Sequence, residues 1–313
     1  MISRLPVVLA TTVVRSAHEG ASHGGAYLVD LETGAQRQVL DWNDGSIDWS
    51  GRGGDRGLRG IAFRGEEVFI AASDEIFVFD REFRKLRSIR SPYLKLCHEI
   101  CIAGDRLYLT STRFDSILVC DLATGRFVAA YCLKLDAERR IQFRAYDPEG
   151  PDGPALADTT HINNVSVEDE VIYVGGLHMN RLIAIREGRA SAHARLPRLT
   201  HNARPFRGGV LANFTGADSV AWFGLDGQVR LSIEVPRYAA ATMTHTDLPQ
   251  DFARQAFGRG LAAIDDNHVV GGSSPATLAV YRLEAPAMLK SIPLSRDVRN
   301  AIHGLEIWPF ANR

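Results

Sequence analysis

The chain has 313 residues, and its 36 lysine and arginine residues against 37 aspartate and glutamate residues give a formal net charge of −1. Proteins that bind nucleic acids or anionic membranes usually carry a basic excess, so we expect neither kind of partner. An apolar fraction of 45% with 23% charged residues is typical of a folded chain. No run reaches the roughly 18 apolar residues that a membrane-spanning helix requires.

The first apolar run, Pro6 to Val14, has no small-residue cleavage site before the charged stretch at 15–19. We therefore predict a β-strand here rather than a signal peptide. The paired spacing of disulfide frameworks and four-cysteine zinc sites is missing, which predicts buried reduced thiols and a cytoplasmic protein. The four cysteines are Cys97, Cys101, Cys120 and Cys132.

A unit of two short strands joined by a tight turn recurs along the chain. The segment Arg59 to Ser73 aligns without a gap with Arg259 to Ser273, and similar units begin near His98, His161 and His201. Such regularly repeated short strands are typical of a β-propeller. Most units are followed by a third strand that often ends in an aspartate-type turn, as at 76–80, 118–125 and 221–227.

The N-terminal unit lacks its first strand. The run Ala26 to Gly34 has the form of a third strand, yet only Pro6 to Val14 precedes it, and the missing strand is found in Ala301 to Pro309. Pairing of the C-terminal strand with the N-terminal blade leaves no open sheet edge. Counting unit starts at 59, 98, 161, 201, 259 and 303 predicts an all-β, six-bladed β-propeller, one domain over residues 1–313.

The unit starts are 39, 63, 40, 58 and 44 residues apart, so a basic unit near 40 residues carries two insertions. Together with a glycine-rich connection, the insertions predict three long loops at about 41–58, 133–160 and 237–257. All three join the outer strand of one blade to the inner strand of the next. We therefore expect them on one face of the propeller, around a pocket.

Histidines gather where the predicted inner strands begin. Neutral imidazoles that converge there could bind a divalent transition metal such as Fe, Zn, Mn, Cu or Ni. The alternative is that they hydrogen-bond to the backbone or to neighbouring asparagines and only fill a polar channel. Four of the six starts carry histidine, namely His98, His161, His201 and His303, and the other two carry Arg59 and Arg259.

The arginines suggest an anionic substrate, because guanidinium groups bind carboxylate or phosphate through paired hydrogen bonds. Arg59 could instead pair with a loop carboxylate such as Asp55. Arg113 and His178 lie in predicted turns between second and third strands on the same face, and they join the candidate catalytic residues. Their alternative is an ordinary solvated turn.

Five short segments follow one another in a distinctive order: His98-Glu99-Ile100, Thr112-Arg113-Phe114, His161-Ile162-Asn163-Asn164, Thr200 to Pro205, and Arg259-Gly260-Leu261-Ala262. In this order and spacing the chain resembles, over about Arg59 to Ser274, a bacterial family of six-bladed β-propeller proteins of unknown function. The resemblance implies no activity. It differs at Asn164, where the family has glycine, and at 202–204. The residues that it marks are His98, Arg113, His161, His201 and Arg259.

The sequence thus predicts a metal-dependent enzyme that acts on a small polar, anionic substrate. Its reaction type stays open between hydrolase, lyase or isomerase, and oxygenase, because the sequence carries no nucleophile elbow, phosphate loop or dinucleotide fingerprint. The alternative is a metal-free module that binds a ligand or peptide. In the enzyme, His98, His161, His201 and His303 would hold the metal, and Arg59, Arg113, Arg259 and His178 would bind substrate or assist catalysis.

Overall fold

The computed structural model describes residues 4–18, 20–43, 57–249 and 253–311. Contacts divide the chain into two compact units. Unit 1 comprises residues 1–61, 213–222 and 230–313, and unit 2 comprises residues 62–212 and 223–229. Each unit has apolar core clusters of its own. The single domain over residues 1–313 stays a prediction.

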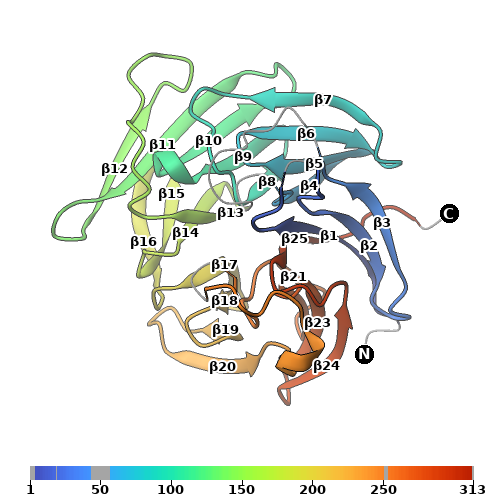
Figure 1. Cartoon of the computed structure of the whole chain (residues 1–313). Coiled ribbons are helices and arrows are strands. Elements are labelled where there is room, and N and C mark those ends of the chain that lie inside the picture. Colours follow the sequence, from blue (N-terminus) through green and yellow to red (C-terminus); the bar gives the residue numbers. More distant parts are fainter. Residues whose placement is uncertain (1–3, 19, 44–56, 250–252, 312–313) are drawn as a thin grey trace. The chain divides into compact units, whose positions relative to one another are not determined.

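The described residues form six small sheets, five with four strands and one with five (Figure 1). Strands that pair in a sheet nearly always follow one another in the chain. Along the chain, strands rich in apolar residues are separated by turns of polar residues. This is the sheet set of a six-bladed β-propeller, so the predicted fold class is confirmed.

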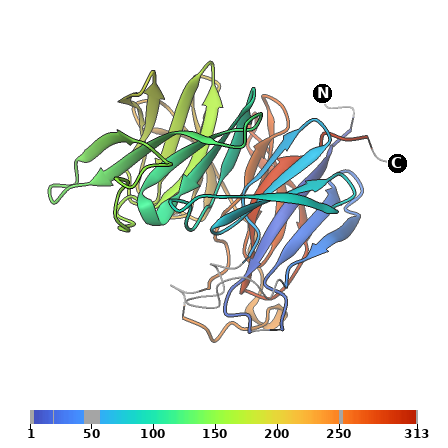
Figure 2. The same cartoon turned by 90° about the horizontal axis from the view of Figure 1, so that it is seen from above.

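The first sheet closes as predicted. Its order is β25-β1-β2-β3, and β25 lies beside β1 in both views (Figures 1 and 2). The two strands are antiparallel, with Val8 opposite Ile307 and Val14 opposite Asn300. The C-terminal strand therefore supplies the missing first strand. The bounds are β1 Val7–Val14, β2 Gly25–Asp30, β3 Gln36–Asp41 and β25 Asn300–Ile307.

Three further sheets belong to unit 2. The first consists of β4 Ile61–Arg64, β5 Glu67–Ala72, β6 Glu75–Asp80 and β7 Lys85–Arg90. The second consists of β8 Ile100–Ala103, β9 Arg106–Ser111, β10 Ser116–Asp121, β11 Phe127–Leu135 and β12 Ile141–Tyr146. The third consists of β13 Ile162–Glu168, β14 Val171–Gly176, β15 Arg181–Arg186 and β16 Arg189–Arg195.

Two sheets complete the set. One consists of β17 Thr200–Phe206, β18 Gly209–Phe214, β19 Ser219–Phe223 and β20 Val229–Glu234. The other consists of β21 Leu261–Ala263, β22 His268–Ser273, β23 Thr277–Arg282 and β24 Ala287–Pro293. The first strands β4, β8, β13, β17, β21 and β25 begin within three residues of the predicted unit starts, or contain them.

The aspartate turns form for a local reason. At Asp30, Asp80 and Asp121 one carboxylate oxygen accepts two backbone N–H groups from the following turn. A short acceptor side chain can thereby replace a backbone partner where a strand ends. Backbone donors, beginning with Thr124 N–H, lower the pKa of Asp121.

The predicted loop at 133–160 is partly wrong. Its first half continues β11 and returns as β12, which makes this sheet five-stranded, and the green hairpin extends away from its neighbours in Figure 2. The hairpin turn is held by Asp136, which accepts from the backbone and side chain of Arg140. The described part of the 237–257 segment contains a 3₁₀ turn, η3 (Ala240–Thr242), and a single parallel β-bridge between Thr244 and Asp297. Most of the 41–58 prediction, including Asp55, lies outside the described residues.

All four cysteines are free, and only Cys101 is partly exposed, so the predicted reduced thiols are confirmed. Burial raises the pKa of Cys120 to about 11, which keeps it as an inert thiol at neutral pH. No helix in the described ranges is long and apolar enough to cross a membrane. The cytoplasmic location stays a prediction.

Candidate functional site

Three imidazoles of unit 2 lie in contact at the ends of its strands. The ring centroids of His98 and His161 are 5.1 Å apart, and those of His161 and His178 are 5.9 Å apart. His98 precedes β8, His161 precedes β13, and His178 lies in the turn between β14 and β15. We call these three residues the histidine cluster.

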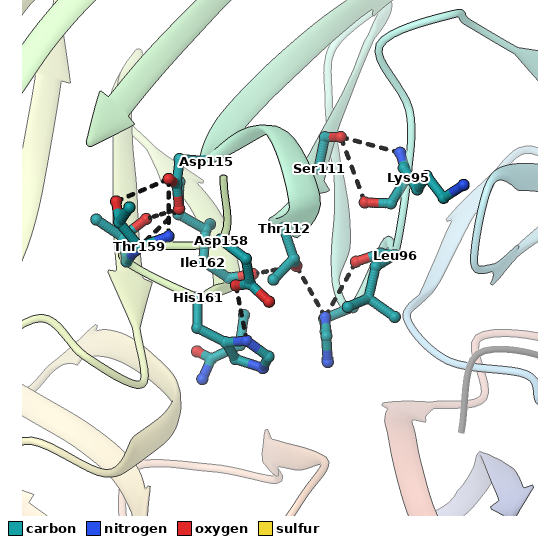
Figure 3. A network of polar contacts seen from close by, with 12 residues as sticks. Lys95, Leu96, Ser111, Thr112, Asp115, Asp158, Thr159, His161 and Ile162 are labelled. Carbon is teal, nitrogen blue, oxygen red and sulfur yellow. Dashed lines mark hydrogen bonds and ion pairs between the residues drawn. The ribbon is translucent and has the colours of Figure 1, made fainter. Parts of the chain in front are cut away.

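The ring of His98 is oriented from one side. Its Nδ1 lies 3.1 Å from the carbonyl oxygen of Leu96 and 2.9 Å from Oγ1 of Thr112. Thr112 donates its own proton to the carbonyl of Ile162, at the start of β13 (Figure 3). Because both neighbours of Nδ1 act as acceptors, Nδ1 carries a proton, and Nε2 is the acceptor nitrogen of the neutral ring.

His161 has the same arrangement with a carboxylate. Its Nδ1 lies 2.9 Å from Oδ1 of Asp158, three residues earlier, and the two side chains point toward each other in Figure 3. Both residues have left-handed backbone, with φ of 49° for His161 and 66° for Asp158. Such strain in residues other than glycine persists only where tertiary contacts hold it.

Asp115 supplies those tertiary contacts. It is fully buried after the 3₁₀ turn η2 (Thr112–Phe114) and accepts four hydrogen bonds of 2.6–2.9 Å. The donors are the N–H and hydroxyl groups of Thr159 and Thr160, which lie between Asp158 and His161 (Figure 3). One buried carboxylate therefore fixes the turn that presents the Asp158–His161 pair.

Backbone hydrogen bonds hold His178 against the same turn. Its N–H donates to the carbonyl of Thr160, and the neighbouring Leu177 N–H donates to the carbonyl of His161. Gly176 permits this approach, because a Cβ there would lie 2.6 Å from the Thr160 oxygen.

Burial, and next the charges of His161 and Arg198, lowers the pKa of His178, with a smaller contribution from Arg139. His178 is therefore neutral at pH 7 beside two exposed arginines.

The predicted residue His201 is 2% exposed on β17. Asn163 and Asn164, on β13, donate to the carbonyls of Thr200 and Ala203 on either side of it. Asn202 donates to the buried carboxylate of Glu99, 2.8 Å away. These asparagines therefore tie neighbouring strands together.

His303 has an arginine partner within unit 1. Its Nε2 lies 2.8 Å from Nη1 of Arg259, so the guanidinium donates to the lone pair that a metal would need. Arg59 lies in the same unit with its side chain 2% exposed. The N–H of Gly304 donates to Oγ1 of Thr11, and that hydroxyl donates to the carbonyl of Arg59. A Cβ at Gly304 would overlap this carbonyl, so glycine is required here.

Arg113 does not join the cluster. Its backbone bonds to Lys95 and Ala157, but its side chain is exposed and has no polar side-chain partner among the described residues. Its role as an anion holder stays a prediction.

In the part of the chain that the structure describes, no group of three or more histidine, cysteine, aspartate or glutamate side chains is placed to hold a metal ion. The residues fit a metal only in part. In His98 and His161, hydrogen bonds hold Nδ1 in place, so Nε2 is the nitrogen that could bind a metal. The four-histidine metal site stays a prediction.

Sequence reasoning missed Asp158, Asp115 and Thr112, which position the cluster. The signal for Asp158 was present, because an aspartate three residues before a histidine can return to its Nδ1 when the turn is tight. The pairing of Asp115 with residues 159 and 160 had no local signal, since they are 44 and 45 residues away.

No protein-family model matches the chain, and no curated protein matches it either. The family resemblance expected from the sequence is therefore without support from these comparisons. Among solved structures, the chain is similar to the computationally designed Ika8 protein at 12% identity, covering 90% of this chain and 86% of that chain with a TM-score of 0.49. It is also similar to a catalytically inactive virginiamycin B lyase from Staphylococcus aureus with quinupristin, at 10% identity, 79% and 73% coverage and a TM-score of 0.47. A chain of the mitotic checkpoint complex has 10% identity, 84% and 83% coverage and a TM-score of 0.49.

Proposed function

We propose that this protein is an enzyme that acts on a small anionic molecule and uses His161 as its general base. The observation that carries the proposal is the 2.9 Å contact between Asp158 and His161 Nδ1. That contact leaves Nε2 as the atom that takes a proton from substrate or water. The carboxylate would hold the ring in this tautomer and stabilise the imidazolium that forms.

Burial and charge around His161 suit this role. Its side chain is 19% exposed, so a small molecule can reach it while most solvent is excluded. His178, neutral because its pKa is lowered, can accept or donate one hydrogen bond beside it. Arg198 and Arg139 bring positive charge to the same place, which favours an anionic substrate. Hydrolysis, elimination and isomerisation can each begin with the removal of a proton by such a base.

A second candidate is the predicted divalent-metal enzyme, and the ring spacing favours it. Two imidazoles that bind one tetrahedral ion at about 2.0–2.1 Å would have their centroids roughly 5 Å apart, and those of His98 and His161 are 5.1 Å apart. His98 and His161 would hold the ion through Nε2. The metal would act as a Lewis acid on the substrate.

The test is a mixture of small carboxylates and phosphate esters incubated with the protein and followed by NMR. His161→Asn is the sharpest variant, because asparagine tolerates the left-handed backbone at this position. We expect it to lower turnover by about 10²–10⁴-fold, and Asp158→Asn to lower it less. His193→Asn, on β16 of the same unit, is the matched control and should keep full turnover.

Two outcomes would contradict the proposal. Unchanged turnover in His161→Asn would remove the general base, and binding of compounds without any turnover would favour the metal-free binding module. Elemental analysis of protein purified without chelator separates the two enzyme candidates. A near-stoichiometric transition metal that disappears in His161→Asn would favour the metal enzyme.

A further inference from the structure

We propose that the β11–β12 hairpin makes the histidine-cluster site specific for phosphate monoesters, with Arg139 and Arg198 as the residues that bind the phosphate group. This inference rests on the proposed function, because it takes the molecule bound at the histidine cluster to be the substrate. All residues concerned belong to unit 2.

The tip of the extra hairpin presents Arg139. Of the six described sheets, this one alone has a fifth strand. At its turn, the carbonyl of Asp136 accepts the N–H of Arg139, whose backbone is left-handed with φ of 61°. Nη2 of Arg139 donates to the carbonyl of His178, 3.3 Å away. The hairpin therefore brings a cation to the backbone of the histidine cluster.

Arg198 reaches the same turn from the connection between β16 and β17. The N–H of the next residue, Leu199, donates to the carbonyl of Leu177, so this connection is held against the turn that carries His178. The charges of Arg198 and Arg139 both act on the His178 ring, since each lowers its pKa. Two segments that are far apart in the chain thus each supply one guanidinium group to one place.

No carboxylate among the described residues forms an ion pair with either arginine. The two acidic side chains of the hairpin tip, Asp136 and Glu138, pair instead with Arg140, each at 2.9 Å. Arg139 has a neutral carbonyl as its hydrogen-bond partner. Both guanidinium groups therefore keep donors for a ligand, and both side chains are exposed to solvent, where a ligand can reach them.

One carboxylate also acts on the His178 ring. The charge of Asp158 raises the pKa of His178, and Oδ1 of Asp158 accepts from Nδ1 of His161. Two guanidinium groups against one carboxylate leave the surroundings of the ring positive. A bound anion is favoured there, and more so once His161 has taken a proton.

Charge and shape select phosphate over carboxylate. Two guanidinium groups are balanced better by the roughly −1.5 to −2 charge of a phosphate monoester at pH 7 than by the single charge of a carboxylate. The planar donors of arginine also match paired phosphate oxygens, and two such groups can bind one phosphate from two directions.

The experiment is a titration of the whole protein with inorganic phosphate, glycerol 3-phosphate and acetate at constant ionic strength, followed through the NMR signals of the His178 ring. We expect both phosphates to shift these signals to saturation, because a dianion beside the ring raises its pKa, and acetate at equal concentration to have no such effect.

Arg139→Gln and Arg198→Gln should each weaken the phosphate affinity by about 10-fold, since each removes charge-assisted hydrogen bonds. Arg189→Gln, a change of an exposed arginine on β16 of the same unit, is the matched control and should bind phosphate like the wild type. Because all three arginines are exposed, the variants should keep the melting temperature of the wild type, so that a lost affinity reports on the site.

Three results would overturn the inference: His178 signals that neither phosphate shifts, an unchanged phosphate affinity in both glutamine variants, or acetate as effective as phosphate. Binding and turnover can fail separately. Phosphate binding that depends on both arginines, without turnover of any ester, would support the phosphate site and contradict only the general base. Turnover that falls in His161→Asn but in neither arginine variant would support the general base and overturn the phosphate site.

Discussion

The histidine cluster of unit 2 and the Arg259–His303 pair of unit 1 satisfy their polar groups in opposite ways. In the histidine cluster, protein acceptors hold Nδ1 of His98 and His161, and Asp115 accepts four hydrogen bonds beneath them. In the Arg259–His303 pair, Nη1 of Arg259 donates to Nε2 of His303, and Nε of Arg259 is buried without a hydrogen bond among the described residues. Protein acceptors therefore preorganise the histidine cluster, whereas the Arg259–His303 pair leaves a buried donor unsatisfied.

The largest expected effect comes from removing the carboxylate beneath the histidine cluster. Asp115→Asn places an amide among four donors, so at least two of them lose their acceptor in a fully buried place. We expect the free energy of unfolding to fall by about 2–4 kcal/mol, measured by urea denaturation.

Asp121→Asn is the matched control for that change. Asp121 also accepts from two backbone N–H groups and a threonine hydroxyl, but in a turn near the surface. We expect its substitution to cost less than about 1 kcal/mol. Equal losses in the two variants would show that Asp115 has no special role in the cluster.

The Arg259–His303 pair should respond to substitution with the opposite sign. At low ionic strength, Arg259→Gln should relieve the repulsion of Arg259 by Arg15 and Arg59. Salt screens such repulsion, so we expect the variant's stability relative to wild type to be higher by about 0.5–1 kcal/mol at 10 mM salt than at 150 mM salt. Urea denaturation at both concentrations measures this, with Arg37→Gln, a change of an exposed arginine on β3 of the same unit, as the control. A variant whose relative stability does not depend on salt would contradict the repulsion of Arg259 by Arg15 and Arg59.

The smallest effect concerns the pH dependence of the histidine cluster. The pKa of His178 is lowered, so between its unfolded value of about 6.5 and its folded value only the unfolded chain binds the proton. His178 therefore contributes stability that is present above about pH 6.5 and is lost as pH falls through the folded pKa. Replacing His178 with glutamine should flatten the dependence of unfolding free energy on pH in this window.

The cause of that shift can be tested separately. Arg198→Gln removes one exposed positive charge that lowers the pKa of His178, so NMR titration should show that pKa rising by roughly 0.2–0.5, because solvent screens exposed charges. A pKa that falls or stays constant in Arg198→Gln would show that the charge of Arg198 does not lower the pKa of His178.

The sequence predicted most of the sheet arrangement. The repeat from Arg59 to Ser73 and the incomplete N-terminal unit predicted the inner strands and the pairing of β25 with β1, because alternating apolar residues and aspartate turns act within a few residues. The same local reasoning missed β12. Its pairing with β11 depends on register across the turn at 136–140 and not on apolar alternation.

The partners of the site residues, in contrast, depend on the folding of the whole chain. The histidines were predicted as a metal site, yet His303 accepts from Arg259, 44 residues away in the chain, and His161 pairs with Asp158 in a turn held by Asp115. Imidazole binds metals, carboxylates and guanidinium groups alike. Its partner is therefore set by which side chains the folded strands bring within about 3 Å, and that is a property of long-range packing rather than of spacing along the chain.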